Sequence, residues 1–285
     1  MQAIDEKNIA VVCNPLAGSG RAMILAKKIS DELSHRNIAY EIFKERWPAD
    51  FSEHTAVFIC GGDGTLNYFI NRYRELKIPI VIFKGGSGND FHWMLYGNKS
   101  FEEQLEIALS AAPKSIDAGS CNENFFINGV GIGFDGAVAK SLTGKKKAPG
   151  KTSFLIAIFE KIFSYRSREY TITSNERQDK SRQLLIGIAN GRRAGGGFHI
   201  APEASANDGW LDVILVNAIH PLKRLRWLPI IEKGGHLHLP FIQYFKTKKI
   251  CISSERPMQA HLDGECYMGK KIEIEILPGK FLFLY

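Results

Sequence analysis

Apolar runs and amphipathic segments alternate along the first part of the chain. Glycine-rich turns follow several of the apolar runs, which is typical of strands that end at a ligand-binding edge. Four buried strands are predicted, at Asn8–Cys13, Ile38–Phe43, Ala56–Cys60 and Pro79–Phe83. One face of an intervening helix carries Leu25, Ile29 and Leu33, and one face of another carries Leu66, Phe69, Ile70 and Tyr73. Strands that alternate with helices predict a mostly parallel sheet, whose ligands bind beyond the carboxyl ends of its strands.

After Ile116 the pattern changes to short strands separated by polar or glycine turns such as Asn175–Lys180. The predicted strands are Phe125–Asn128, Glu169–Ser174, Gln183–Ala189, Leu211–Val216, Phe241–Ser253, Met258–Leu262, Lys271–Leu277 and Phe281–Tyr285. Two helices are predicted among them, at Thr152–Phe163 and Pro221–Ile231. The expected fold class is therefore α/β plus all-β: an α/β domain over residues 1–116 and an antiparallel β-sandwich over residues 117–285.

Composition places the chain among globular proteins. It has 285 residues, of which 45% are hydrophobic and 24% charged, which argues against a disordered, collagenous or disulfide-scaffold protein. No apolar run approaches the ~20 residues of a membrane-spanning helix, and the charged start Met1–Asn8 does not fit a signal peptide. Five scattered cysteines without a CxxC pair indicate neither a disulfide framework nor a zinc site. We therefore expect a soluble, cytoplasmic protein.

Positive charge is concentrated in the second half. Up to Ile116 there are 13 basic and 14 acidic residues, a net of −1, and the remainder holds 24 and 16, a net of +8. The excess gathers at Lys145–Lys147 with Lys151, and at Lys223–Leu228. Such a run is either a solvated face or a surface that meets an anionic membrane, and Trp227 within it favours the membrane. No nucleic-acid-binding motif is present, so nucleic acid is not an expected partner.

Three glycine-rich turns carry the candidate chemistry: Asn14–Gly20, Gly61–Thr65 and Gly85–Asp90. Such turns after strands leave N–H groups free to bind phosphates, although none of them matches a P-loop. Asp63 in the second turn either holds Mg²⁺ on a nucleotide's phosphates or caps the following helix, and the sequence leaves both open. Gly131–Gly136 spells G-x-G-x-x-G, but its β-rich surroundings do not favour a dinucleotide fingerprint.

The ordered set of motifs resembles the catalytic region of diacylglycerol kinases and related bacterial lipid kinases. The resemblance spans nearly the whole chain and implies an NAD-kinase-like α/β domain joined to a β-sandwich, with MgATP bound between them. Its motifs are Asn14-Pro15 with Gly18–Gly20, Gly61–Asn67, Gly86–Phe91, Ala201–Ser205, Asp208–Val213 and Asp263–Glu265.

The resemblance also assigns roles to individual residues. It makes Glu265 the general base on the lipid hydroxyl, and Asp63, beside the phosphates, is also expected to be catalytic. It implies a structural Mg²⁺ bound by Asp208 and the main-chain oxygens of Ser205 and Trp210. Around the nucleotide it places Asn14, Gly18, Ser19, Gly20, Arg21, Gly62, Asp63, Gly64, Thr65, Leu66, Asn67 and Ser87.

The chain departs from the family pattern at three places. Tyr68 stands where the family usually has glutamate, which alters the edge of the nucleotide or metal site. Ser87 replaces the usual threonine and keeps its hydroxyl. Many bacterial relatives continue past the position of Tyr285, so a homodimer is left open by the resemblance.

The expected activity is transfer of a phosphoryl group from ATP, with Mg²⁺, to a hydroxyl of a membrane-derived, diacylglycerol-like lipid. A sphingoid base is the second choice of acceptor. An NAD kinase is the nearest enzyme alternative, and a degenerate kinase that only binds lipid or nucleotide is the non-enzymatic one. The apolar segment Thr152–Phe163 either packs a core or lines an acyl-chain pocket. Peripheral attachment to an anionic membrane surface is expected because the substrate stays in the bilayer.

Overall fold

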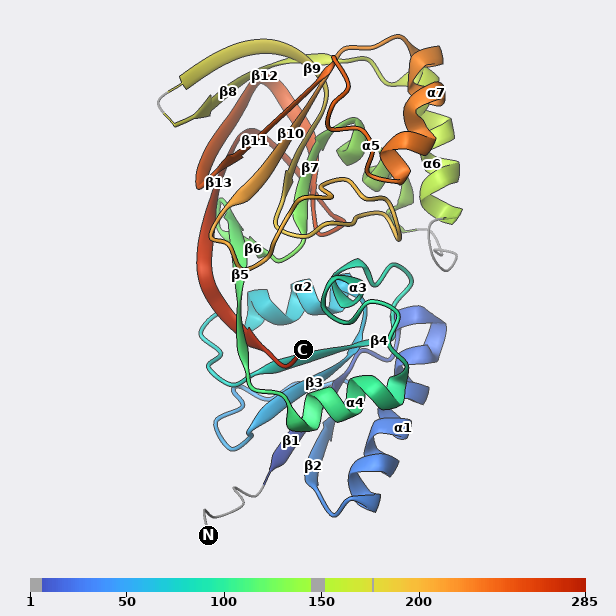
Figure 1. The fold of residues 1–285 in the computed structure, drawn as a ribbon, viewed down its shortest axis with the longest axis vertical. Coiled ribbons are helices and arrows are strands. Elements are labelled where there is room, and N and C mark those ends of the chain that lie inside the picture. The colour runs from blue at the N-terminus through green and yellow to red at the C-terminus, as the bar shows by residue number, and fades with distance from the viewer. Residues whose placement is uncertain (1–6, 145–151, 176) are drawn as a thin grey trace. The chain divides into compact units, whose positions relative to one another are not determined.

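The computed structural model describes residues 7–144, 152–175 and 177–285. The chain forms two compact units (Figure 1). The first contains the residues up to Ile116 together with Lys280–Tyr285, and the second is Asp117–Gly279. The second unit thus begins at the expected residue and ends before the chain does, because the last strand enters the sheet of the first unit.

The first unit is built on a parallel sheet, as predicted. Its strands are β1 (Asn8–Cys13), β2 (Ala39–Phe43), β3 (Ala56–Gly61) and β4 (Ile80–Lys84), in the order β2-β1-β3-β4. Each neighbouring pair is parallel. The end of β13 (Glu265–Phe283) adds a further parallel strand beside β4, where Phe283 pairs with Ile80.

Helices connect the strands of the first unit. They are the short turn η1 (Ala17–Gly20), α1 (Arg21–His35), α2 (Asp63–Arg72), α3 (Asp90–Tyr96) and α4 (Phe101–Ser110). The apolar face predicted for α2 is buried along its whole length. On α1, Ile29 and Leu33 are buried as predicted, whereas Leu25 is half-buried and the buried face includes Ala22 and Ala26.

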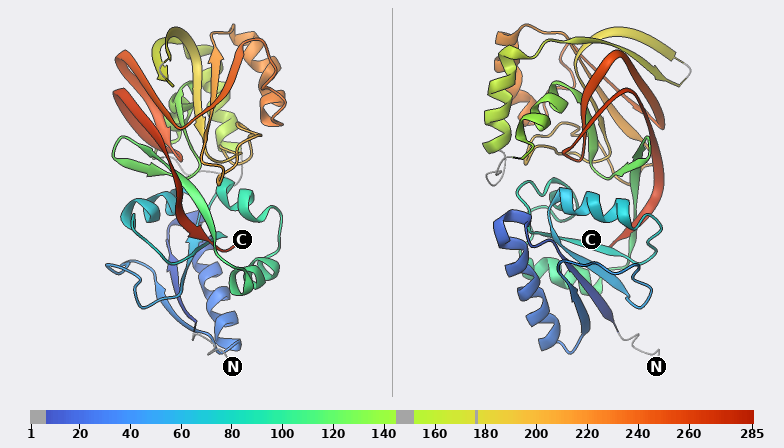
Figure 2. Two further views of the ribbon diagram at one scale, coloured as in Figure 1. Left: turned by 60° about the vertical axis from the view of Figure 1, so that its left-hand side comes forward. Right: turned by 180° about the vertical axis from the view of Figure 1, so that it is seen from behind.

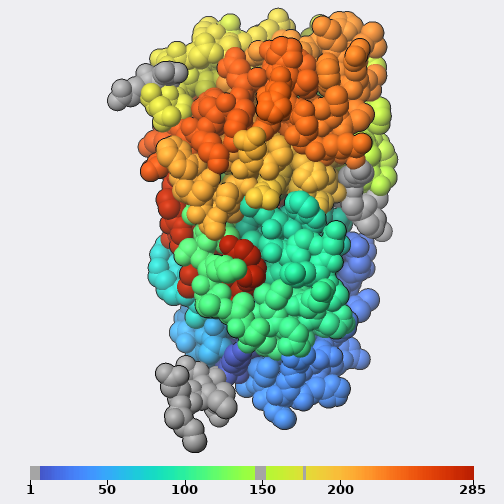
Figure 3. Space-filling model, viewed as in Figure 1, coloured from blue at the N-terminus to red at the C-terminus, as the bar shows by residue number. Residues whose placement is uncertain are grey.

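The C-terminal segment is held to the first unit by hydrogen bonds. The hydroxyl of Tyr96 donates to the main-chain oxygen of Leu284 at 2.6 Å, and the ammonium of Lys114 donates to that of Tyr285 at 2.8 Å. These contacts bring the end of the chain to the surface of this unit beside the segment that precedes Asp117 (Figure 3).

The second unit is β-rich and antiparallel, as predicted. In addition to β13 it contains β5 (Lys114–Cys121), β6 (Asn124–Phe126), β7 (Gly129–Gly133), β8 (Arg168–Ser174), β9 (Arg177–Ala189), β10 (Leu211–Asn217), β11 (Ile242–Thr247) and β12 (Lys249–Leu262). The order is β11-β10-β9-β7-β12-β13. Strand β8 pairs with both β9 and β12, and β5 pairs with β6 and β13. The expected fold class, α/β followed by an antiparallel β-rich domain, is confirmed.

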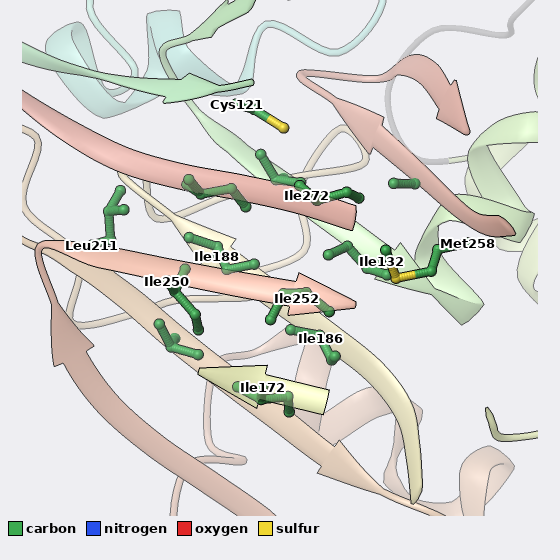
Figure 4. Packing of buried hydrophobic residues seen from close by; sticks show 14 of the residues in the cluster. Cys121, Ile132, Ile172, Ile186, Ile188, Leu211, Ile250, Ile252, Met258 and Ile272 are labelled. Carbon is green, nitrogen blue, oxygen red and sulfur yellow. The ribbon is translucent and has the colours of Figure 1, made fainter. Parts of the chain in front are cut away.

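The strands of the second unit enclose an apolar core (Figure 4). Leu211, Val213 and Leu215 of β10 point into this core, and the alternate residues Ile214 and Val216 join a second cluster on the opposite face. Three helices belong to this unit: α5 (Phe134–Leu142), α6 (Thr152–Ser164) and α7 (Pro221–Glu232). Helices α6 and α7 lie side by side (Figures 1 and 2).

Several strand boundaries differ from those predicted. The segment predicted as one strand, Phe241–Ser253, is divided between β11 and β12, and Met258–Leu262 is the end of β12 beyond an irregularity in its pairing. The two predicted C-terminal strands are both parts of β13. Strand β6 starts before Phe125 and ends at Phe126 rather than Asn128, and Arg177–Lys180, predicted as turn, is the start of β9.

The basic run Lys145–Lys147 and Lys151 lie outside the described residues. Among the residues that are described, no helix is long and apolar enough to cross a membrane.

Candidate active site

The three glycine-rich turns of the first unit meet at the carboxyl ends of β1, β3 and β4. A Cβ added to Gly18 would lie 2.2 Å from the main-chain oxygen of Gly85, and one added to Gly62 would lie 2.7 Å from the Cα of Gly86. Glycine is required at these positions because the turns touch through their backbones. In contrast, a Cβ at Gly20 would have no neighbour within 4 Å, so the first turn is open on that side.

Two of the residues predicted to surround the nucleotide, Asn14 and Arg21, connect the first turn to the others by hydrogen bonds. The amide of Asn14 donates to the Thr65 hydroxyl at 3.2 Å. The guanidinium of Arg21 donates to the main-chain oxygens of Gly18 and Gly86, each at 2.9 Å. Hydrogen bonds therefore join Asn14 to Thr65 and Arg21 to Gly18 and Gly86, and Gly62 lies against Gly86 through its backbone.

Asp63 has defined partners in the structure. Its two carboxylate oxygens accept the main-chain N–H groups of Asp90, at 3.1 Å, and Phe91, at 3.0 Å. A carboxylate at this place satisfies the first N–H groups of α3 and complements the positive end of its dipole. The alternative that Asp63 caps the helix directly after its turn is wrong, because Asp63 is itself the first residue of α2 and its carboxylate caps α3 instead. A role for Asp63 toward Mg²⁺ stays a prediction.

The remaining predicted nucleotide residues differ in accessibility. Ser19 and Gly64 are exposed, and Ser87 is half-buried in the third turn. Leu66 and Asn67 are buried on α2, so their side chains face the core of the first unit. Gly62 directly precedes α2 and has no side chain to cap this helix, which leaves first-turn N–H groups available to an anion.

Tyr68 lies on the exposed side of α2. Its ring contacts Trp47 edge-on, with 5.3 Å between the ring centres. A hydrogen bond from Arg72 to the Tyr68 hydroxyl raises the pKa of the Arg72 guanidinium. Tyr68 therefore packs on the surface of the first unit, where it takes part in an aromatic and cationic cluster.

Glu265 lies in the second unit, directly after the turn that joins β12 to β13. Its side chain is exposed, and within the described part of the chain its carboxylate has no hydrogen-bond or ion-pair partner. The neighbouring Asp263 is fully engaged: its carboxylate accepts the N–H groups of Ile127, Asn128 and Gly129 at 2.8 to 2.9 Å. The turn is thus rigidly held while Glu265 remains accessible to a substrate.

The loop predicted to hold a structural Mg²⁺ is anchored by a residue that the sequence did not single out. Buried Asp117 accepts the N–H groups of Gly209 and Gly279, each at 2.7 Å. Asp208 of this loop accepts the Trp210 N–H at 3.0 Å and pairs with the ammonium of Lys246 at 2.7 Å.

The donor set only partly fits a divalent cation. One carboxylate with two main-chain oxygens is a type of ligand set that Mg²⁺ uses. However, the ammonium of Lys246 already supplies a positive charge at this loop. It pairs with Asp208 and also lies 3.7 Å from the buried carboxylate of Asp212, so it competes with a cation for both carboxylates. Across residues 7–144, 152–175 and 177–285, no three His, Cys, Asp or Glu side chains gather as a metal site. The Mg²⁺ ligands Ser205, Asp208 and Trp210 stay a prediction.

An apolar cavity of about 110 Å³ lies within the second unit. Phe154, Ile158 and Ile162 of α6 form part of its wall. Residues of α5, α7, β9, β10, β11 and the connecting loops complete it, including Asp135 of α5, Arg224 of α7 and His236 of the loop before β11. One face of α6 therefore packs in the second unit and also lines this cavity, and binding of an acyl chain there stays a prediction.

Arg224 differs from the other cations of its stretch. Its guanidinium is buried and donates to the main-chain oxygens of Ile162 and Tyr165, at 2.6 and 2.9 Å. It thereby stabilises the carboxyl end of α6. The expectation that all of Lys223–Leu228 forms one docking face is wrong for Arg224, and Trp227 is half-buried against Phe241. Lys223 and Arg226 are exposed.

Three functional candidates were missed by sequence reasoning: Asp117, Asp135 and His261. Asp135 and His261 hydrogen-bond each other at 2.9 Å although 126 residues separate them. The available signals were local. Asp117 follows the expected domain boundary, Asp135 falls inside the G-x-G-x-x-G spelling, and His261 stands two residues before the Asp263–Glu265 motif.

A parallel α/β unit with converging glycine turns, joined to an antiparallel β-rich unit, defines a kinase-like class of two-domain protein. Residues 8–121 match the diacylglycerol kinase catalytic domain family, and residues 128–284, more than half of the chain, match the YegS C-terminal NAD kinase beta sandwich-like domain family. The chain therefore belongs to the diacylglycerol kinase catalytic-domain family that carries this β-sandwich.

Relatives and solved structures agree with this assignment. A protein of Shewanella frigidimarina named "Probable lipid kinase YegS-like" is 28% identical over 80% of this chain and 75% of its own length. A "Diacylglycerol kinase" of Mycobacterium tuberculosis is 25% identical over 95% of this chain and 93% of its own. Two solved structures from Bacillus anthracis str. Sterne share the fold, with TM-scores of 0.79 and 0.72. They are 23% and 22% identical and cover 98% of this chain and 97% of theirs, and the second is described as a diacylglycerol kinase.

Proposed function

We propose that this protein is a lipid kinase that transfers the terminal phosphoryl group of ATP, with Mg²⁺, to a hydroxyl of a diacylglycerol-like lipid. Family membership supports phosphoryl transfer to a lipid. The observation that favours a lipid over a water-soluble acceptor such as NAD is the apolar cavity of the second unit. Its wall of aromatic and aliphatic side chains suits an acyl chain.

The first unit supports the nucleotide half of the proposal. Its converging turns present backbone N–H groups without a Cβ in the way, and the uncapped N-terminus of α2 attracts negative charge. Asn14 and Arg21 hold the turns in register through hydrogen bonds that leave the open side at Gly20 accessible. ATP, when bound with Mg²⁺, supplies the phosphoryl group and the cation that offsets its charge.

Glu265 is the proposed general base. Its exposed carboxylate accepts the proton of the lipid hydroxyl, and the resulting alkoxide oxygen forms the new bond to phosphorus as the bond to ADP breaks. Among the residues that the structure describes, no cation pairs with Glu265, which suits this role because a carboxylate paired with a cation is a weaker base. Asp263 contributes by fixing the turn from which Glu265 projects.

We also propose that the second unit docks on an anionic membrane. Helix α6 lines the cavity with one face and exposes Ile156, Phe159 and Phe163 on another. Beside it, α7 exposes Leu222 together with Lys223 and Arg226. Apolar side chains flanked by cations fit a bilayer surface that carries anionic headgroups, and the +8 net charge of this half is complementary to it.

The test is incubation of the protein with γ-labelled ATP and four acceptors: diacylglycerol, monoacylglycerol, sphingosine and NAD. The proposal expects label in diacylglycerol, and label in sphingosine alone would change the acceptor to a sphingoid base. Label only in NAD, or in none of the four, would contradict the lipid-kinase proposal and favour the NAD-kinase or the non-catalytic alternative.

A further inference from the structure

The turn that carries Glu265 is a two-residue hairpin. Leu262 pairs with Glu265 across it, and the two residues between, Asp263 and Gly264, both have positive φ angles of 47° and 91°. An Asp-Gly pair suits this geometry because both central residues of such a turn must adopt the left-handed region. Asp263 ties the turn to Ile127–Gly129 on one side.

A second set of hydrogen bonds, made by His261, also holds the turn. The Nδ1 of His261 accepts the Gly264 N–H at 3.2 Å, so the ring proton resides on Nε2. That Nε2–H donates to the carboxylate of Asp135 at 2.9 Å. Asp135 belongs to the first turn of α5, where a carboxylate complements the helix dipole.

Gly131 has no side chain, and this leaves room for the hydrogen-bonded pair Asp135 and His261. A Cβ at Gly131 would lie 2.2 Å from Asp135 Oδ2 and 2.4 Å from His261 Nε2. Gly131, the first glycine of the G-x-G-x-x-G pattern, is therefore required by this packing and does not indicate a bound nucleotide. Asp135 also forms part of the cavity wall. The hydrogen-bonded chain Asp135–His261–Gly264 therefore runs from the apolar cavity to the residue that precedes Glu265.

We infer that Asp135 and His261 are positioning residues that orient Glu265 for proton transfer from the lipid hydroxyl. The inference rests on the proposed function, in which Glu265 is the base. Asp263 fixes where the turn lies, and the His261 link to Gly264 fixes the peptide next to Glu265. A displacement of about 1 Å at a reacting group can lower a rate about 100-fold, so this link has consequences for turnover.

The test uses a pair of substitutions that differ only in hydrogen bonding. Asp135→Asn keeps an oxygen that accepts the His261 Nε2–H, whereas Asp135→Ala removes it. We expect Asp135→Ala to lower kcat with diacylglycerol by about 10- to 100-fold with an unchanged KM for ATP, and Asp135→Asn to stay within about threefold of wild type. A wild-type kcat in Asp135→Ala, or an equal loss in both variants, would overturn the inference.

A second variant separates positioning from general loss of structure. His261→Asn retains an acceptor for the Gly264 N–H but cannot reach Asp135, so it should lower kcat as Asp135→Ala does, without further loss when the two are combined. In a Glu265→Gln background, Asp135→Ala should leave the residual rate unchanged. An additional loss there would overturn the inference. Failure of the proposed function itself would appear differently, as wild-type protein that transfers no label to lipid or as Glu265→Gln with full activity.

Discussion

The carboxylate of Asp63 and the main-chain N–H of Phe91 are joined by a hydrogen bond of 3.0 Å. The bond connects the second glycine turn, at the start of α2, to the start of α3. Asp63 therefore holds two of the turns together whatever it does toward a nucleotide.

Substitution of Asp63 distinguishes these roles. Asp63→Ala should lower the free energy of unfolding by about 0.5 to 2 kcal/mol, the usual effect of removing a helix cap, and Asp63→Asn should lower it less because one acceptor oxygen remains. If Asp63 also serves the phosphates, Asp63→Asn will reduce kcat/KM for MgATP far more than it changes stability or lipid affinity. Urea unfolding and steady-state kinetics on the same samples measure both effects. Kinetic constants equal to wild type in Asp63→Asn would leave Asp63 with the capping role alone.

Asp208 and Lys246 provide a test of the predicted metal loop. We expect Mg²⁺ to raise the melting temperature of the wild-type protein through this loop, and Asp208→Asn to abolish that increase. Lys246→Met should enlarge it, because the ammonium 2.7 Å from the carboxylate no longer competes with the cation. Differential scanning fluorimetry across a Mg²⁺ titration gives the result, and a metal response that survives in Asp208→Asn would remove this residue as a ligand.

Buried histidines predict how stability depends on pH. Burial lowers the pKa of His236, and it likewise lowers those of His92 and His199. The unfolded chain, with an ordinary histidine pKa of about 6.5, binds more protons in this range, so the native state loses stability as pH falls below that value. His236→Gln can still donate to Ile200, as the histidine does at 3.0 Å, but does not titrate.

The difference in unfolding free energy between about pH 7.5 and about pH 5.5 should therefore be smaller in His236→Gln than in wild type. The exposed His238 supplies the control, since His238→Gln should retain the wild-type dependence. Identical pH dependence in wild type and His236→Gln would show that this buried ring does not contribute.

Membrane docking is tested with the exposed cations only, because Arg224 stabilises α6. Lys223→Gln with Arg226→Gln should weaken binding to anionic vesicles at low salt by about 2 kcal/mol, roughly 1 kcal/mol per cation, and the difference should shrink at high salt. Activity on detergent-dispersed lipid should be preserved. Lys27→Gln with Lys99→Gln removes the same charge from exposed positions of the first unit. Equal weakening by both double variants in co-sedimentation would show that net charge, and not this surface, determines binding.

The sequence predicted the first unit well because β1, β3 and β4 are buried along almost their whole length and appear in the sequence as apolar runs. In the second unit the strands pair irregularly, and local patterning was less informative. Gly129–Gly133 has too little side-chain bulk to show a strand pattern, yet it forms the central strand β7. Pro278 and Gly279 suggested a break, yet β13 continues through them.

The parts of the candidate site that consist of residues adjacent in sequence could be predicted, as in the turn Gly61–Thr65 and the motif Asp263–Glu265. The parts that depend on contacts between residues distant in sequence could not be predicted. The bond between Asp135 and His261 joins residues that are distant in sequence. Arg224 looked like its solvated neighbours, and only the packing of α7 against α6 shows that it is buried.

Phosphoryl transfer by the Glu265→Gln variant tests the central claim most directly. The substitution keeps the size of the side chain and removes the proton acceptor, so fold and ATP binding should be retained. The account predicts that transfer of label from ATP to diacylglycerol in mixed micelles falls about 10²- to 10⁴-fold relative to wild type. Turnover near the wild-type rate in this variant would contradict the assignment of Glu265 as the base of a lipid kinase.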